Sequence, residues 1–94
     1  MSNQLQRKLL EQAHDATLVK YSKIEWQSVT FTGHRHQLTF QFMDEPSRVS
    51  FAERVIDGKV DVNLIDGTML CDVCLLEVDM ELNTITVEAL TLNE

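Results

Sequence analysis

The chain has 94 residues, a length that supports one domain with a single small core. Hydrophobic residues make up 44% of it and charged residues 24%, with only three glycines and one proline, so the composition argues against a long disordered segment. The net charge is −7, and this excess of carboxylates disfavours direct binding to nucleic-acid phosphates.

The charge is divided unevenly along the chain. Residues 1–43 carry a net charge of +2 and residues 44–94 a net charge of −9. An acidic half of this kind fits a basic partner, a cation or a need for solubility. The start of the chain lacks the basic and apolar regions of a signal peptide, and no apolar run reaches the length of a membrane span. We therefore expect a cytoplasmic protein with reduced cysteines and no membrane contact.

The first predicted element is an amphipathic helix over residues 3–19. Its apolar residues recur at spacings of three and four: Leu5, Leu9, Leu10, Ala13, Ala16 and Leu18. Ser2 or Asn3 can cap its first turn by accepting a hydrogen bond from an unpaired backbone N–H. The apolar stripe predicts that this helix packs against another element.

A hairpin is predicted next, with strands at residues 23–32 and 37–43 joined by a loop at residues 33–36. This loop pairs Phe31 with Leu38 on one face of the sheet. It also places Trp26 opposite Met43, but on the other face. The apolar side of the hairpin therefore changes partway along its length.

A second helix is predicted at residues 45–57. Asp44 is a suitable N-cap, Pro46 fits the first turn, and Gly58 fits the C-terminal stop. The expected apolar stripe consists of Val49, Ala52, Val55 and Ile56, with Phe51 beside it, and Arg48, Glu53 and Asp57 on the other side.

Residues 60–92 predict a three-stranded antiparallel meander. This stretch has no lysine or arginine, and its Asp66-Gly67 dipeptide favours a two-residue turn. That turn pairs Val62 with Cys71 and sets Asp61 opposite Asp72. Such a pair of like charges is destabilising unless it faces water or a cation.

The second turn of the meander is predicted at residues 81–84. It pairs Met80 with Ile85, Val78 with Val87, Leu76 with Ala89, and Leu75 with Leu90. The apolar side then changes in both strands at the same rung, which requires no bulge. Either the two helices cover opposite faces at opposite ends of the sheet, or a partner covers the apolar surface that they leave.

Together these elements predict one α+β domain over residues 1–94, in the order α-β-β-α-β-β-β, with a mainly antiparallel sheet of about five strands. No internal repeat is detectable in the sequence.

Two cysteines and two histidines supply the ligand count of a structural zinc site: His34, His36, Cys71 and Cys74. A zinc-binding Cys-x-x-Cys usually lies on a tight turn, whereas this one is predicted within a strand. Residues three apart in a strand point to opposite faces, which also argues against a redox pair. We therefore predict no metal and no cofactor, and interpret the cysteines as small core residues.

Glu77 and Glu88 are predicted to face each other, and paired carboxylates can serve acid–base catalysis. Such a pair is also common on the solvated face of an antiparallel sheet. The chain contains no glycine-rich phosphate loop and no metalloprotease or hydrolase motif. We therefore do not expect an enzyme.

The function predicted from these patterns is a small protein-interaction module, homodimeric or adaptor-like. An apolar patch would make the contact, and acidic residues would surround it. The patch consists of Leu76, Val78, Met80, Ile85 and Val87, and the acidic rim of Asp61, Asp72, Glu77, Asp79 and Glu88. Two alternatives stay open: an acidic inhibitor, immunity-type protein or nucleic-acid mimic that binds a basic partner, and a small metal-binding or enzymatic domain.

Overall fold

The computed structural model describes residues 4–13, 16–30, 32–58 and 68–93. The elements are α1 (Gln4–Gln12), β1 (Ala16–Gln27), β2 (Thr32–Phe42), α2 (Glu45–Ile56), β3 (Thr68–Asp79) and β4 (Thr84–Asn93). The strands form one antiparallel sheet in the order β1-β2-β4-β3. The predicted α+β class is confirmed, with four strands in the described part of the chain. No described helix has the length and apolar character needed to cross a membrane.

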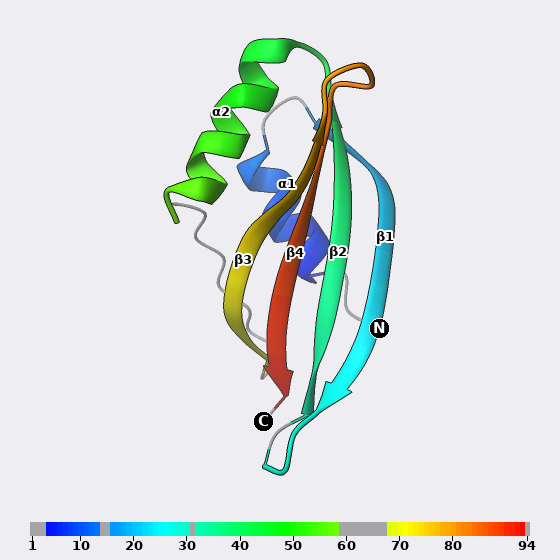
Figure 1. The fold of residues 1–94 in the computed structure, drawn as a ribbon, viewed down its shortest axis with the longest axis vertical. Coiled ribbons are helices and arrows are strands. Elements are labelled where there is room, and N and C mark those ends of the chain that lie inside the picture. Colours follow the sequence, from blue (N-terminus) through cyan, green and yellow to red (C-terminus); the bar gives the residue numbers. More distant parts are fainter. Residues whose placement is uncertain (1–3, 14–15, 31, 59–67, 94) are drawn as a thin grey trace.

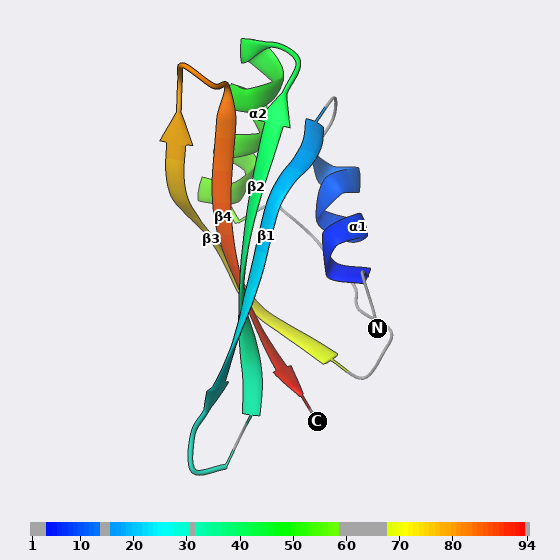
Figure 2. The same ribbon diagram turned by 90° about the vertical axis from the view of Figure 1, so that its right-hand side faces the viewer.

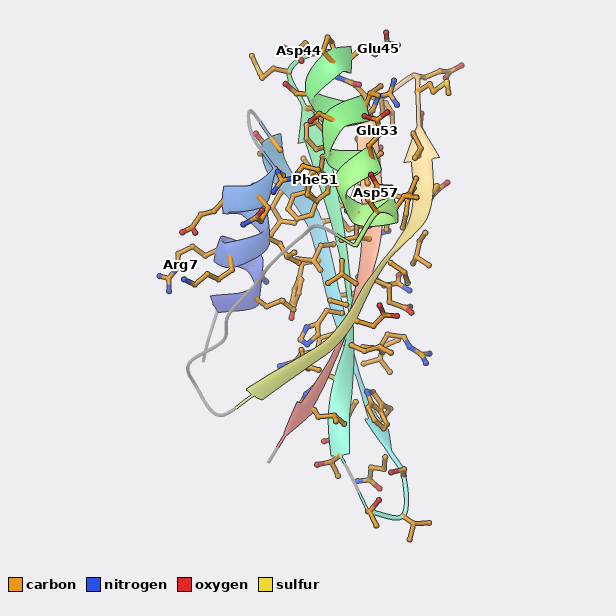
Figure 3. The ribbon with its side chains drawn as sticks, turned by 90° about the vertical axis from the view of Figure 1, so that its left-hand side faces the viewer. Arg7, Asp44, Glu45, Phe51, Glu53 and Asp57 are labelled. Carbon is orange, nitrogen blue, oxygen red and sulfur yellow. The ribbon has the colours of Figure 1, made fainter. Side chains whose placement is uncertain are left out.

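Among the described elements the order α-β-β occurs twice, and each hairpin supplies one central and one edge strand of the described sheet. Both helices cover the same face of the sheet, as Figures 1 and 3 show. We call this the inner face and the opposite one, turned to the viewer in Figure 2, the outer face. The long, twisted strands continue well past the helices, so neither described helix covers the far end of the sheet (Figure 1).

The core lies between the two helices and the inner face. Its central strands contribute Leu38, Phe40, Phe42, Ile85, Val87 and Ala89, and the helices contribute Leu5, Leu9, Phe51 and Val55. The ring of Phe51 stands edge-on to that of Phe40, with 5.6 Å between centroids, and lies 5.7 Å from that of Phe42. In Figure 3 it points from α2 toward the sheet.

The first helix is shorter than predicted. The Ala13 N–H donates to the carbonyls of Leu9 and Leu10, and α1 ends there. Residues 16–19, assigned to the helix by their spacing, belong to β1. β-Branched Thr17 and Val19 favour a strand, and Leu18 packs against the core from a position opposite Phe40.

The turn of the first hairpin was also wrongly placed. Gln27 pairs with Thr32, so the chain turns before residue 32. Gly33, His34 and His36 lie within β2, and Trp26 pairs with Gly33 rather than Met43. A Cβ on Gly33 would overlap the carbonyl oxygen of Thr91 and approach Cζ2 of Trp26 to 3.0 Å. This glycine therefore permits close packing within the sheet and does not form a turn.

The second helix and its caps are confirmed. Asp44 accepts a 2.9 Å hydrogen bond from the Ser47 N–H, Pro46 lies in the first turn, and Gly58 has φ of +70°. The buried side is different from the predicted stripe, because it includes Arg48 and leaves Ile56 exposed.

Arg48 is only 5% exposed, although the sequence predicted it on the polar side of α2. Its Nε donates to Oδ1 of Asn83 at 2.6 Å, and its Nη2 lies 3.3 Å from the Glu45 carboxylate. Asn83 also donates from its amide to the Phe42 carbonyl at 2.9 Å. These partners compensate for the burial of the guanidinium group and tie α2 to the β3–β4 turn.

The register of the β3–β4 hairpin is shifted from the prediction. Asp79 pairs with Thr84 and Val78 with Ile85, so the turn spans residues 80–83. Asp79 accepts hydrogen bonds from the N–H groups of Glu81 and Leu82 at 3.0 and 3.1 Å, which starts this turn.

The change of apolar side in β3 is produced by bulges, which the prediction had excluded. The register shifts between Leu70 and Asp72 and again between Leu75 and Glu77. Leu75 therefore pairs with Val87 on the inner face, and Leu76 is the extra residue, 48% exposed. The predicted strand at residues 60–64, with its Asp66-Gly67 turn, lies outside the described residues.

Candidate interaction surface

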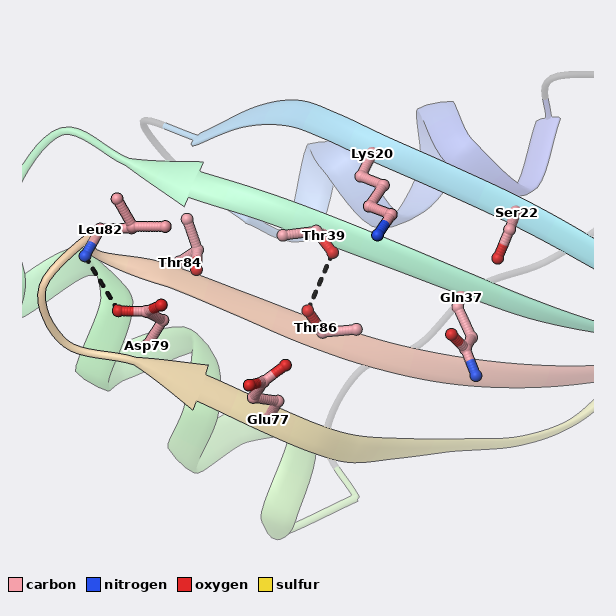
Figure 4. A pocket seen from close by; sticks show the side chains of 9 residues that line it. All are labelled: Lys20, Ser22, Gln37, Thr39, Glu77, Asp79, Leu82, Thr84 and Thr86. Carbon is pink, nitrogen blue, oxygen red and sulfur yellow. Dashed lines mark hydrogen bonds between the residues drawn. The ribbon is translucent and has the colours of Figure 1, made fainter.

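The outer face of the sheet carries an open groove of about 270 Å³ that crosses all four strands. It is lined by Lys20, Ser22, Gln37, Thr39, Glu77, Asp79, Leu82, Thr84 and Thr86. Figure 4 shows the Lys20 amine and the Glu77 carboxylate reaching over it from opposite sides. Side chains alternate between the two faces of a strand, so the polar residues between the core positions form this surface.

Threonine and glutamine side chains form the floor of the groove. The hydroxyls of Thr39 and Thr86, a directly paired couple on β2 and β4, lie 2.8 Å apart (Figure 4). The Gln41 amide donates to the Leu82 carbonyl at 3.2 Å. Cross-strand hydrogen bonds of this kind hold short side chains in place, so the floor is an ordered polar surface.

The β3–β4 side of the outer face is acidic. Glu77 and Asp79 pair with Thr86 and Thr84, and Asp72 and Glu88 alternate onto the same face. Glu88 lies 3.7 Å from the Arg35 guanidinium. Partial burial, followed by the charges of Glu88 and Asp72, raises the pKa of the Cys74 thiol, which is consistent with a local negative potential.

The far end of the outer face, beyond the helices, is largely apolar, with the charged Arg35 between Ile24 and Leu90. Ile24, Trp26, Leu90 and Leu92 share it through the pairings of β1 and β4 with β2. Ile24 is 57% exposed, whereas the other three are partly buried. The Trp26 indole lies against Gly33, so an aromatic ring covers the backbone where a side chain is missing. Its Nε1 is buried without a hydrogen-bond partner among the described residues.

A buried histidine lies on the inner face, close to the start of α1. His36 is 7% exposed; its Nδ1 lies 2.7 Å from the Tyr21 hydroxyl and its Nε2 3.0 Å from Oγ1 of Thr91. Burial lowers the pKa of His36 to about 4, and the charges of His34 and Lys23 contribute. Burial also raises the pKa of Tyr21, against a smaller opposing effect of its hydrogen bond to Gln6. We assign this neutral network to the packing of the sheet.

The structure separates the five residues of the predicted apolar patch. Ile85 and Val87 are completely buried on the inner face, and Val78 packs against the core beside them. Leu76 lies at a bulge, and Met80, 77% exposed, lies in the β3–β4 turn. A helix of the same chain therefore covers most of this patch.

The predicted acidic rim is largely brought together. Asp72, Glu77, Asp79 and Glu88 all lie on the outer face of β3 and β4, while Asp61 lies outside the described residues. The predicted pairing of Glu77 with Glu88 is wrong, because Glu77 faces Thr86 and Glu88 faces Cys74. The two carboxylates are therefore neighbours along an acidic surface and not a directly opposed couple.

The histidines and cysteines do not converge. His34 and His36 lie on the inner face, whereas Cys74 pairs with Glu88 and lies on the outer face. The side chain of Cys71 is outside the part that the structure describes. Within that part, no three metal-binding side chains are grouped as a metal site would require.

Sequence reasoning missed the groove, because it predicted no pairing between β2 and β4, and this pairing places Thr39 beside Thr86. The alternation of these threonines with core residues was the available signal. Comparison of the chain with protein-family models, curated proteins and solved structures found no match.

Proposed function

We propose that this chain is a small protein-interaction module that receives a basic partner on the outer face of its sheet. The supporting observation is that both helices cover the inner face, so a four-stranded polar surface with a groove remains open. A face of this kind offers ordered donors and acceptors together with a row of carboxylates. It supports docking better than catalysis, because no described nucleophile has a histidine beside it on this face.

The charges on the outer face favour a cationic partner segment. Asp72 and Glu77 are exposed on β3, and neither carboxylate has an ion pair or hydrogen bond with another described residue that a partner would have to break. Complementary charges raise association rates and select partners, and their effect decreases with added salt. The exposed thiol of Cys74 supports a reducing compartment, so we place the module in the cytoplasm.

The same face supports an acidic inhibitor as a second candidate. An inhibitor would block the basic site of its target through the carboxylates of β3 and β4. It differs from an adaptor in forming one salt-sensitive complex that abolishes the activity of the target, whereas an adaptor leaves that activity intact.

The test compares two charge-matched variants in affinity capture from the native host. Asp72→Asn/Glu77→Gln removes two charges from the outer face, and Glu11→Gln/Glu53→Gln removes two from the exposed sides of the helices. We expect the first variant to lose a salt-eluted protein that the wild type and the second variant both retain. Equal capture by all three proteins would contradict docking on the outer face.

A further inference from the structure

Strands β1 and β3 are the two edges of the described sheet, and an edge strand can pair with another chain. The two bulges of β3 interrupt regular pairing along its edge. β1 has a single irregularity, at Val19, and residues 20–27 then follow β2 without interruption. The second half of β1 is therefore the more suitable edge for strand addition.

This half of β1 is also uncovered. Residues 22–25 are all exposed, whereas α1 packs near the start of the strand, beside Ala16 and Leu18. Figure 2 shows the remainder of β1 running past α1 toward the hairpin end. A second strand can approach this edge without meeting a helix of the same chain.

We propose that β1 pairs antiparallel with β1 of a second copy, with the two-fold axis passing through Ile24. Each Lys23 then faces the partner's Glu25, which gives two opposite-charge pairs. The described four-stranded sheets of the two copies join into one continuous sheet, and the outer face of each copy stays open. This dimer goes beyond the proposed function, because it uses an edge of the sheet and not the outer face.

The charges select this register. The N–H and C=O groups of one residue point to one edge of a strand, and those of the next residue point to the other edge. When a strand pairs antiparallel with its own copy, the two-fold axis therefore passes through a residue that faces itself. Centring on Lys23 or on Glu25 would set two like charges opposite each other. Of the registers centred within residues 20–27, the one at Ile24 sets Lys23 against Glu25. Opposite charges directly across an antiparallel pair are stabilising, and like charges are destabilising.

The apolar side chains of the edge agree with this register. On the outer face Ile24 meets its own copy, and Ser22 lies opposite the partner's Trp26. Ile24, which is 57% exposed in the single chain, becomes buried against its copy. The helices of the two copies lie at opposite ends of the joined sheet, and the bulged β3 edges limit further strand addition.

Cross-linking tests the position of the axis. In a Cys71→Ser/Cys74→Ser background, Ile24→Cys places a single thiol opposite its own copy. Facing residues have Cα atoms about 4.5–5.5 Å apart, within the range of a disulfide. Ser22→Cys, on the same face but four residues from its own copy, is the control. We expect oxidation to convert the I24C protein to a covalent dimer and to leave the S22C protein largely monomeric. Equal cross-linking of the two would overturn the register.

Charge reversal tests the pairing, with sedimentation equilibrium as the measurement. Lys23→Glu and Glu25→Lys each create two like-charge pairs and should raise the dimer dissociation constant by about tenfold or more. The double variant restores opposite charges and should restore the dimer, which a change in folding alone would not do. A monomeric wild type, or a double variant no tighter than the singles, would refute the proposal.

The two proposals can fail separately. Asp72→Asn/Glu77→Gln should retain the dimer while losing the captured partner. Lys23→Glu should lose the dimer while retaining capture by the outer face. If Lys23→Glu also abolishes capture, the outer face does not act alone. If Asp72→Asn/Glu77→Gln abolishes the dimer, β1 pairing does not account for self-association.

Discussion

The buried ring of His36 predicts that the fold loses stability as the solution is acidified. Burial, with smaller contributions from His34 and Lys23, lowers the pKa of this imidazole to about 4 in the folded chain. In the unfolded chain its pKa is about 6.5, so between these values the unfolded state binds a proton that the folded state does not. The stabilisation is fully present above about pH 6.5 and is lost as the pH falls toward about 4.

These two pKa values set the size of the effect. The difference between the folded and unfolded pKa values makes the free energy of unfolding about 2 kcal/mol lower at about pH 5 than at about pH 7.5. Solvent screens the exposed charge of Lys23, so we expect about 1–2 kcal/mol. Because a domain of this size loses about 1 kcal/mol of stability per molar urea, the midpoint should fall by about 1–2 M.

Urea unfolding of wild type, His36→Gln and His34→Gln at these two pH values is the assay. Carboxylates also titrate near the lower pH. The informative quantity is therefore how much the pH-dependent change in stability differs between the variants. His36→Gln should lose most of the histidine-dependent change, whatever its stability at neutral pH. His34→Gln, two residues away on the same face, should retain most of it, because burial of His36 is the main cause. A His36→Gln protein with the wild-type pH dependence would refute this reasoning.

Two further predictions concern packing and are measured by urea unfolding. Phe51→Ala removes a ring that is 1% exposed and should lower the free energy of unfolding by about 3–5 kcal/mol. Val49→Ala, on the exposed side of the same helix, should cost well under half of that. Similar losses for the two variants would mean that α2 does not pack as described. Gly33→Val would force a side chain against the Thr91 carbonyl and the Trp26 ring, and we expect a loss of about 2 kcal/mol or more with a changed Trp26 fluorescence. An unchanged midpoint and spectrum would show that the Trp26–Gly33 contact does not form.

The elements predicted best are those with local signals. Asp44, Pro46 and Gly58 predicted the ends of α2 correctly, because caps act through backbone groups only a few residues away. The residues of the acidic rim were also largely predicted, but alternation alone would place Asp72 and Glu77, five positions apart, on opposite faces. They share the outer face because of the bulge at Leu76.

The errors arose where the partner of a strand decides the outcome. Gly33 was interpreted as a turn residue, but in the structure it allows Trp26 to pack across β2. The change of apolar side was predicted at the same rung in both strands of the β3–β4 hairpin, but the bulge at Leu76 produces it in β3 alone. A two-residue difference in register leaves the pattern of alternation unchanged, so periodicity cannot detect it.

The α+β class, the second helix with its caps and the acidic second half can be predicted from residue order alone, because each depends on composition or on residues close together in the chain. Three other features require the folded chain: both helices cover one face, Arg48 is buried against Asn83, and the outer face carries a groove. These features depend on contacts between residues more than 30 positions apart, such as Thr39 with Thr86. Such contacts follow from strand pairing and packing, which no local pattern of residue types specifies.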